Sequence, residues 1–304
     1  MDSRIVVNQV LILFLIMIIG FFARKKRVLT PDLTKGFTSL LLNVTCPLTI
    51  FTAFQLEYSA SMLVSAGQAL VFTMVIHLFS IVISLFLYNK YPTEIKQVLR
   101  FSTIFSNCGF MGFPLLQSIY GKTGVFYGSI YVIGFHLFIW TVGVSIFTGH
   151  QDRAALKKVL TNPNIIAVFL GIITFLLPIK LPAAVNSALE MVAAMNTPLS
   201  MLLVGSVLTE VKLTEMFTGF PVYYGTFVRL LLMPFCALLI TDLFGFSPLL
   251  QGACVLVTAT PVASLTTAFT EKYNGDSLLA SRLTLLSTLG AIITLPFIGF
   301  LLNK

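Results

Sequence analysis

The run Val10-Leu-Ile-Leu-Phe-Leu-Ile-Met-Ile-Ile19 decides the fold class, because it is apolar on every face of a helix drawn through it. A transmembrane β-barrel needs strands of about ten residues in which apolar and polar side chains alternate. A helix, in contrast, satisfies its own backbone hydrogen bonds in lipid. The run therefore predicts a membrane-spanning helix.

The composition extends this prediction to the whole chain. Of 304 residues, 57% are hydrophobic and only 10% are charged, and the mean hydropathy is +0.96. These values exclude a water-soluble globular domain. Crossing roughly 30 Å of hydrocarbon takes about 20 helical residues. Nine runs of at least 19 residues hold no Asp, Glu, Lys or Arg, and a tenth is interrupted only by Arg229: 5–23, 36–56, 58–89, 101–121, 123–151, 159–179, 191–209, 221–240, 243–270 and 283–303.

We therefore expect ten transmembrane helices, numbered one to ten in this order. The first is followed by the basic residues 24–27 and by no small-residue cleavage site, so we interpret it as a retained helix rather than a signal peptide. On this interpretation the mature chain starts at Met1.

The formal net charge of +8 comes from Lys and Arg residues that are concentrated in alternate loops. The loops after the odd-numbered helices hold 14 Lys and Arg residues, whereas the opposite side holds four. Because basic loops stay in the cytoplasm, both termini are expected outside the cytoplasmic membrane. The charge is thus a topology signal, and we expect no nucleic-acid partner. The 14 are Arg24, Lys25, Lys26, Arg27, Lys35, Lys90, Lys96, Arg100, Arg153, Lys157, Lys158, Lys212, Lys272 and Arg282, and the four are Arg4, Lys122, Lys180 and Lys304.

The cysteines and histidines show no catalytic or metal-binding spacing. They are scattered over the helices, and no phosphate-binding glycine loop occurs. We therefore expect no enzymatic activity, no metal and no cofactor. The residues concerned are Cys46, Cys108, Cys236, Cys254, His77, His136 and His150.

Two Pro-centred segments indicate an internal repeat. Thr45-Cys-Pro47-Leu-Thr49 and Asn196-Thr-Pro198-Leu-Ser200 lie 151 residues apart, and the segment beginning Ser106-Asn107 matches Thr260-Pro261-Val262 at nearly the same offset. We expect a first five-helix repeat in 1–149, a cytoplasmic linker in 150–164 and an inverted second repeat in 165–304. Because five is odd, the second repeat enters the membrane in the opposite sense, as in many secondary transporters.

Helices four and nine hold the least regular backbone. Ser106 to Pro114 contains two glycines and a proline, and helix nine contains Thr258-Ala-Thr-Pro261. Proline removes an amide donor and clashes with the preceding turn, so we expect both helices to be broken there. In transporters, broken helices point half-helix N-termini at anionic groups. The alternative is the general tolerance of membrane helices for Gly and Pro.

At these positions the chain resembles the auxin efflux carrier family, which includes plant PIN-type auxin carriers and bacterial malate or malonate permeases. The resemblance covers nearly the whole chain and rests on the order of several short motifs. They are Asn43-Val-Thr-Cys-Pro47-Leu, Ser106-Asn-Cys-Gly-Phe-Met-Gly112-Phe-Pro114, Trp140-Thr-Val-Gly143, Arg229-Leu-Leu-Leu-Met-Pro234, Pro261 with Glu271-Lys-Tyr273-Asn, and Leu295-Pro296.

The resemblance implies the fold of bile acid symporters and sodium/proton antiporters, with helices four and nine crossing at mid-membrane. It further implies a dimerising scaffold of helices one, two, six and seven, and a transport part of helices three to five and eight to ten that moves like an elevator. The chain departs from the family at Ser106, where plant carriers have Pro, and at His136, where many relatives have Asn. Helix three also lacks the charged residues of plant carriers, which argues against auxin itself.

Asn107 is the first candidate for the substrate site, because a buried amide donates to a carboxylate without the desolvation cost of a buried cation. Its alternative role is to cap the half-helix, and hydroxyls in such helices often bond to their own backbone. The expected substrate-binding set is Ser106, Asn107, Cys108, Gly109, Thr260, Pro261, Val262, Thr45, Thr49 and Ser200, with Gly109, Gly112, Pro114 and Pro261 as crossover residues.

Three intramembrane side chains have ionisable groups of interest. Arg229 is interpreted as an anchor that snorkels to the cytoplasmic headgroups rather than as a ligand. His77 and His136 titrate near neutrality in their unperturbed state and could couple transport to protons. Their alternative role is that of a satisfied core histidine.

The sequence thus predicts a secondary transporter that moves a small organic carboxylate, such as malate, malonate or an auxin-like acid, across the cytoplasmic membrane. H⁺ or Na⁺ is the expected coupling ion, and a homodimer in the lipid bilayer is the expected assembly. Two alternatives stay open. One is a sodium-coupled carrier like the bile acid symporters, and the other is a membrane sensor that binds a ligand without moving it.

Overall fold

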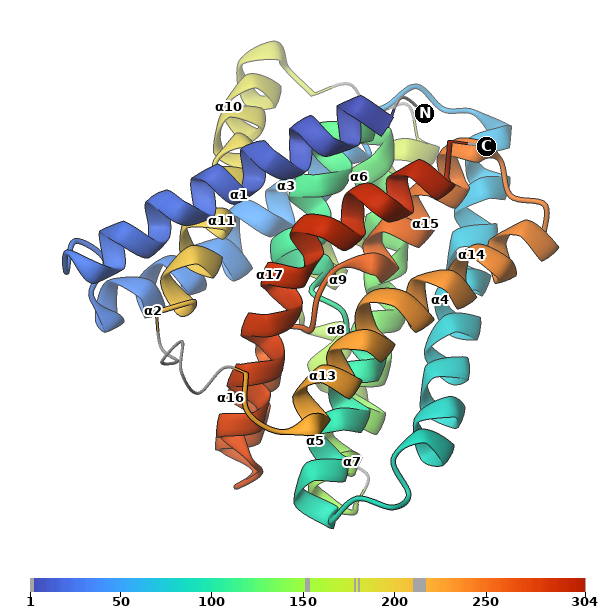
Figure 1. The fold of residues 1–304 in the computed structure, drawn as a ribbon. Coiled ribbons are helices and arrows are strands. Elements are labelled where there is room, and N and C mark those ends of the chain that lie inside the picture. Colours follow the sequence, from blue (N-terminus) through green and yellow to red (C-terminus); the bar gives the residue numbers. More distant parts are fainter. Residues whose placement is uncertain (1–2, 151–153, 178, 180, 210–216, 304) are drawn as a thin grey trace.

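The computed structural model describes residues 3–150, 154–177, 179, 181–209 and 217–303, and these residues form helices joined by loops (Figure 1). Their β pairing is confined to one isolated bridge, so the all-helical class is confirmed. The helices are α1 Ser3–Lys25, α2 Pro31–Leu40, α3 Cys46–Ala53, α4 Ala60–Leu87, α5 Thr93–Ile104, α6 Phe113–Phe138, α7 Val144–Thr148, α8 Ala155–Leu160, α9 Pro163–Leu176, α10 Ala183–Ala194, α11 Asn196–Val207, α13 Phe220–Phe227, α14 Met233–Leu243, α15 Pro248–Ala259, α16 Leu265–Lys272 and α17 Ser277–Leu301.

Short π-helical turns join some of these helices into longer ones: η1 Leu41–Thr45, η2 Cys108–Gly112, η3 Ile139–Gly143 and η4 Val228–Leu232. Pro47, Pro114 and Pro234 follow the ends of η1, η2 and η4 by two residues. A proline ring clashes with the carbonyl four residues earlier, and the wider π turn relieves that clash. The helices therefore continue through these prolines.

Local sequence signals set the ends of several helices. The Thr30 hydroxyl accepts a hydrogen bond from the Leu33 N–H (3.3 Å) and begins α2. The Asp276 carboxylate does the same for the Leu279 N–H (2.9 Å) at the start of α17. Gly149, at φ +72°, ends α7 in the left-handed conformation that glycine adopts without strain.

Seven helical stretches of the described chain are long and apolar enough to cross a membrane, and the shorter apolar helices α9 and α15 accompany them. One of the seven, Cys108–Thr148, has 41 residues and contains Gly121, whose φ of 60° and ψ of −147° are not helical. The sequence interpretation divides this stretch between helices four and five. The structure thus supports a polytopic membrane protein, whereas the ten-helix layout stays a prediction.

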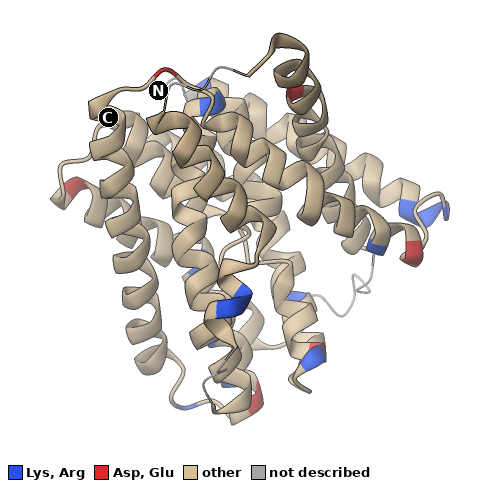
Figure 2. Ribbon diagram, turned by 180° about the vertical axis from the view of Figure 1, so that it is seen from behind, with Lys and Arg blue, Asp and Glu red and all other residues tan. Residues whose placement is uncertain are grey.

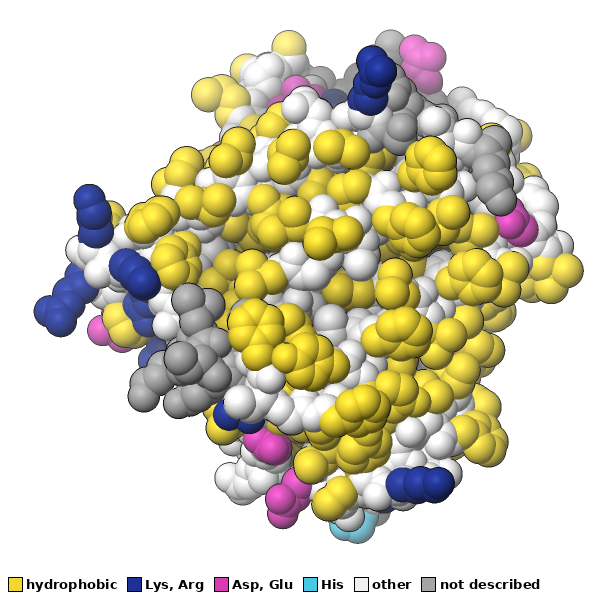
Figure 3. Space-filling view, viewed as in Figure 1, with side chains coloured by type: hydrophobic (Ala, Val, Ile, Leu, Met, Phe, Trp, Pro, Cys, Tyr) yellow, Lys and Arg dark blue, Asp and Glu magenta, His cyan; other side chains and the backbone are white. Residues whose placement is uncertain are grey.

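The surface agrees with a membrane setting. Hydrophobic side chains cover the middle of the face in Figure 3, and charged side chains lie toward its margins. The two chain ends lie at the same end of the molecule (Figure 1). Lys and Arg gather mainly at the lower end and on one side in Figure 2. Four cations of the sequence interpretation lie outside the described residues, namely Arg153, Lys180, Lys212 and Lys304.

Candidate functional site

Two helices are interrupted in the segments that the sequence singled out. α5 ends at Ile104 and the helix resumes at Cys108, whereas α15 ends at Ala259 and α16 begins at Leu265. Pro114 lies in the first turn of α6, beyond η2. The first interruption therefore precedes Pro114, which is not the residue at which the helix breaks.

The two interruptions pair with each other. Ser106 and Val262 form an antiparallel bridge. The Asn107 N–H donates to the Pro261 carbonyl (2.8 Å), and the Ala263 N–H donates to the Phe105 carbonyl (3.1 Å). Unwound backbone at membrane depth is tolerated only where protein or a cavity satisfies its polar groups. These bonds provide that satisfaction and fasten the two broken helices into one crossing.

Arg229 occupies the side of the crossing where α5 and α15 end. Its guanidinium donates to the carbonyls of Thr103 (2.8 Å), Thr260 (3.2 Å) and Thr258. The last four carbonyls of a helix have no partner within the helix. Arg229 is only 1% exposed, so the expectation that it snorkels to the headgroups is wrong. Its side chain instead points inward, because the carbonyls at the crossing supply the polar partners that it needs.

The opposite side of the crossing is where the next half-helices begin. The first-turn N–H groups of η2 have no carbonyl partner within their helix. The Asn107 side chain forms no capping bond to this turn. Its Nδ2 donates instead to Ser264 Oγ (3.0 Å), at the start of α16. Asn107 therefore links the two half-helix beginnings rather than capping its own.

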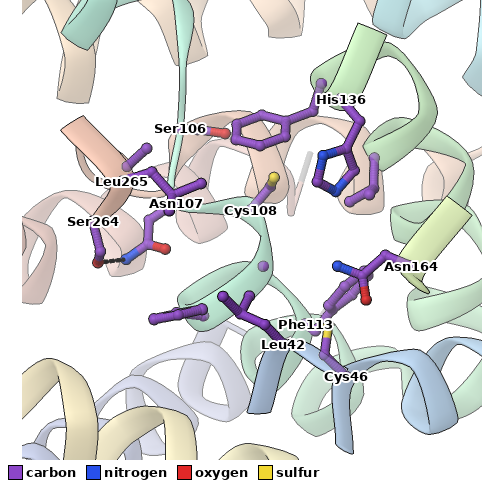
Figure 4. A pocket seen from close by; sticks show the side chains of 15 residues that line it. Leu42, Cys46, Ser106, Asn107, Cys108, Phe113, His136, Asn164, Ser264 and Leu265 are labelled. Carbon is purple, nitrogen blue, oxygen red and sulfur yellow. Dashed lines mark hydrogen bonds between the residues drawn. The ribbon is translucent and has the colours of Figure 1, made fainter. Parts of the chain in front are cut away.

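A cavity of about 50 Å³ lies between these two beginnings (Figure 4). This volume holds a few waters or one small solute. Figure 4 shows Asn107 and Ser264 on one side and His136 and Asn164 on the other. His136 Nδ1 and Asn164 Oδ1 are buried without a hydrogen-bond partner. No Lys, Arg, Asp or Glu of the described chain lines this cavity, which is otherwise mainly aromatic and aliphatic.

The structure divides the predicted substrate residues into two groups. One group lines the cavity: Ser106, Asn107, Cys108 and Gly109. The other group lies outside the lining: Thr260, Pro261, Val262, Thr45, Thr49 and Ser200. In this second group the hydroxyls bond back to helix carbonyls, as in Thr260 to Val257 (2.8 Å) and Ser200 to Thr197 (3.0 Å).

The two membrane histidines have different surroundings. His136 lines the cavity and is 8% exposed. His77 does not line it: its Nδ1 lies 2.7 Å from the Thr73 carbonyl, and its ring stacks on Phe138 with centroids 5.3 Å apart. His136 is thus placed to meet a solute, whereas His77 packs in the core.

A second cavity, of about 350 Å³, lies beside Thr49 and Gln117. At its edge Lys122 Nζ lies 2.5 Å from Glu190 Oε1, and both side chains are 39% exposed. This ion pair connects the turn after Gly121 to α10.

Ser264 and Asn164 were not among the predicted site residues, and the direction of the Arg229 side chain differs from the predicted one. A lone charge in an apolar run marks Arg229 as unusual, but its inward direction depends on the fold. Asn164 is the last residue of the expected linker, 150–164, and resembles a helix-start residue. Only the packing of α9 against α3 and α6 brings it to the cavity.

Apolar helices long enough to cross a membrane, with a cavity at two interrupted ones that carries a few polar side chains, are typical of a membrane transporter. The sequence model of the membrane transport protein family matches residues 5–299. The chain therefore belongs to this family, that of the auxin efflux carriers.

Curated relatives agree with this assignment. An uncharacterized transporter of Methanocaldococcus jannaschii is 22% identical over 310 residues, which cover 97% of this chain and 99% of the relative. An uncharacterized transporter of Escherichia coli is 23% identical over 304 residues and 95% of each chain. One from Methanothermobacter thermautotrophicus is 26% identical over 192 residues, which cover 62% of this chain and 63% of the relative.

Proposed function

We propose that this transporter moves a small organic carboxylate across the cytoplasmic membrane by alternating access, with its substrate site in the cavity at the crossing. The observation that carries the proposal is the meeting of two half-helix beginnings at that cavity. Helix beginnings carry partial positive charge and free N–H groups, which favour an anion. The amide of Asn107 and the unpartnered atoms of His136 and Asn164 add polar groups for orientation.

The layout proposed for this function is ten helices in two inverted repeats, 1–149 and 165–304. Thr45 Oγ1 lies 3.3 Å from Asn196 Oδ1, two positions that the repeat offset of 151 relates. The packing of α1 against α11 corresponds to that of α9 against α3 when each helix is exchanged for its repeat mate. Both termini lie at one end of the molecule (Figure 1), which requires an even number of crossings. These three observations support the repeat.

The family supplies the rest of the proposed mechanism. Helices one, two, six and seven form the scaffold and the homodimer contact, and the remaining helices move as an elevator. Both termini lie outside, because the basic loops stay in the cytoplasm. His136, which lines the cavity, is the candidate for proton coupling, and a sodium-coupled carrier remains the alternative.

The test is uptake of labelled malate, malonate, 2-oxo acids and indole-3-acetate into proteoliposomes, with and without sodium and a pH gradient. We expect saturable uptake of one acid that is lost in Asn107→Ala. Asn43→Ala is the matched control, since its exposed amide bonds only within its own helix, to Ser39. Full activity of Asn107→Ala would overturn the site, and binding without uptake would favour the sensor.

A further inference from the structure

Arg229 is a buried cation whose charge is not balanced by any acidic side chain of the described residues. It is 1% exposed and lies in η4, between the apolar helices α13 and α14. The ion pair found among the described residues joins Lys122 to Glu190 and does not involve it. All three of its bonds go to carbonyls at the ends of α5 and α15. Within the part of the chain that the structure describes, its positive charge is thus met by helix ends alone.

The charges at the crossing can be summed. A helix carries roughly +0.5 charge at its beginning and −0.5 at its end. Two ends, of α5 and α15, and two beginnings, of η2 and α16, meet here, so their partial charges cancel. The guanidinium offsets the two ends, and the two beginnings at the cavity then remain with about one positive charge.

We propose that Arg229 sets the sign and the size of the charge that the cavity selects. It acts from outside the lining, as a positioning residue that makes the crossing prefer one negative charge. The cavity itself offers no cation in the described chain, and its walls include Phe110, Phe113 and Phe135. A second negative charge would lie against these apolar walls. The favoured substrate is therefore a monoanion with an uncharged remainder, which His136 and Asn164 orient.

This inference rests on the proposed anion site, and its first test varies charge on one carbon skeleton. Malonate, malonamate and malonamide carry two, one and no negative charges at pH 7. Their binding to the purified full-length protein in nanodiscs would be measured by calorimetry. We expect malonamate to bind at least about tenfold more tightly than malonamide, since a unit charge at an effective dielectric near 20 has an effect of this order. We also expect malonamate to bind more tightly than malonate.

The variants separate charge from structure. Arg229→Gln is expected to bring the ratio of malonamate to malonamide affinity close to one. Lys122→Gln, which removes a cation outside this cavity, is expected to leave the ratio unchanged. Arg229→Lys serves if the Gln variant does not fold, because a lysine loses its charge as the pH rises whereas arginine does not. As the pH rises from 7 to 10, the ratio of malonamate to malonamide affinity of Arg229→Lys is expected to fall below that of the unaltered protein, which stays constant.

Two results would overturn the proposal. One is a parallel loss of affinity for all three probes in Arg229→Gln. The other is a ratio of malonamate to malonamide affinity in Arg229→Lys that stays as high as that of the unaltered protein up to pH 10. If the unaltered protein binds none of the probes, the proposed carboxylate function is refuted. The role of Arg229 is then tested separately, by the rates at which charged reagents modify the Cys108 thiol. With the other three cysteines replaced by Ser, an anionic methanethiosulfonate is expected to modify Cys108 faster than a cationic one. An unchanged rate ratio in Arg229→Gln would then refute the role of Arg229.

Discussion

The two sides of the crossing use the same backbone elements in opposite ways. On the side where α5 and α15 end, Arg229 fills the space and satisfies three carbonyls. On the side where η2 and α16 begin, a cavity of about 50 Å³ remains, and buried polar atoms lack partners. A satisfied polar network stiffens a protein, whereas unsatisfied groups raise its free energy until a ligand pairs with them. The first side is thus built for stability and the second for exchange.

The largest effect is expected from removing the guanidinium on the side of the crossing where α5 and α15 end. Arg229→Met leaves the carbonyls of Thr103, Thr258 and Thr260 buried without this donor, and should lower the free energy of unfolding by about 3–5 kcal/mol. Denaturant unfolding in detergent measures the change. Leu230→Met, at the neighbouring buried residue, is the control and should cost less than about 1.5 kcal/mol. Equal stability of the two variants would contradict the comparison.

Placing a charge on the open side should abolish transport without unfolding the protein. Asn107→Asp puts a carboxylate where the substrate anion is proposed to bind, and repulsion should lower uptake by about 100-fold or more. Stability should change by no more than about 1 kcal/mol, because an anion is favourable at a helix beginning. Uptake and thermal unfolding are compared with Asn303→Asp, at an exposed position after the end of α17. Normal uptake by Asn107→Asp would rule out this anion site.

A smaller effect distinguishes two glycines of η2. A Cβ at Gly112 would lie 3.1 Å from Val257 Cγ2, whereas one at Gly109 would meet nothing within 4 Å. Gly112→Ala should therefore cost about 1 kcal/mol of stability. Gly109→Ala should leave the fold intact and reduce uptake severalfold, because its methyl group enters the cavity. The comparison fails if Gly109→Ala is the less stable variant in thermal unfolding.

The smallest effect is expected away from the crossing. Lys122→Gln removes an ion pair whose two side chains are each 39% exposed, and exposed pairs contribute about 0–1 kcal/mol. Thermal unfolding at low and high salt should show a difference that salt removes. A loss as large as that of Arg229→Met would mean that the crossing is not the main polar support.

Much of this arrangement was predictable from the sequence, and the rest depends on lateral packing. Charge-free runs predict apolar helices, and the glycines and prolines after Ser106 and around Pro261 mark the interruptions. The position of Arg229 within its apolar run, 221–240, also predicts how far along the helix axis it lies. It gives neither the direction of that side chain nor its neighbours, since a cation can reach outward to headgroups or inward to carbonyls.

The candidate site was predicted in part for the same reason. Asn107 and its flanking residues line the cavity because they belong to the interruption itself. Thr45, Thr49, Ser200 and Thr260 were chosen for their hydroxyls, which bond instead to nearby carbonyls or to Asn196. Asn164 and Ser264 come from other segments. Ser264 follows Pro261 by three residues, within the segment expected to cross helix four, whereas nothing near Asn164 in the sequence indicates that it meets Asn107.

The π turns have a consequence for aligning relatives. Each one inserts an extra residue into a helix, and one residue corresponds to a rotation of about 100°. Beyond η1, η2 and η4 the side chains therefore point about a quarter turn away from the direction that an unbroken α-helix would give them. A helical wheel drawn through 31–53 misassigns the lipid-facing stripe beyond Thr45. A relative that lacks Pro47, Pro114 or Pro234 together with its π turn should align with a single-residue gap there.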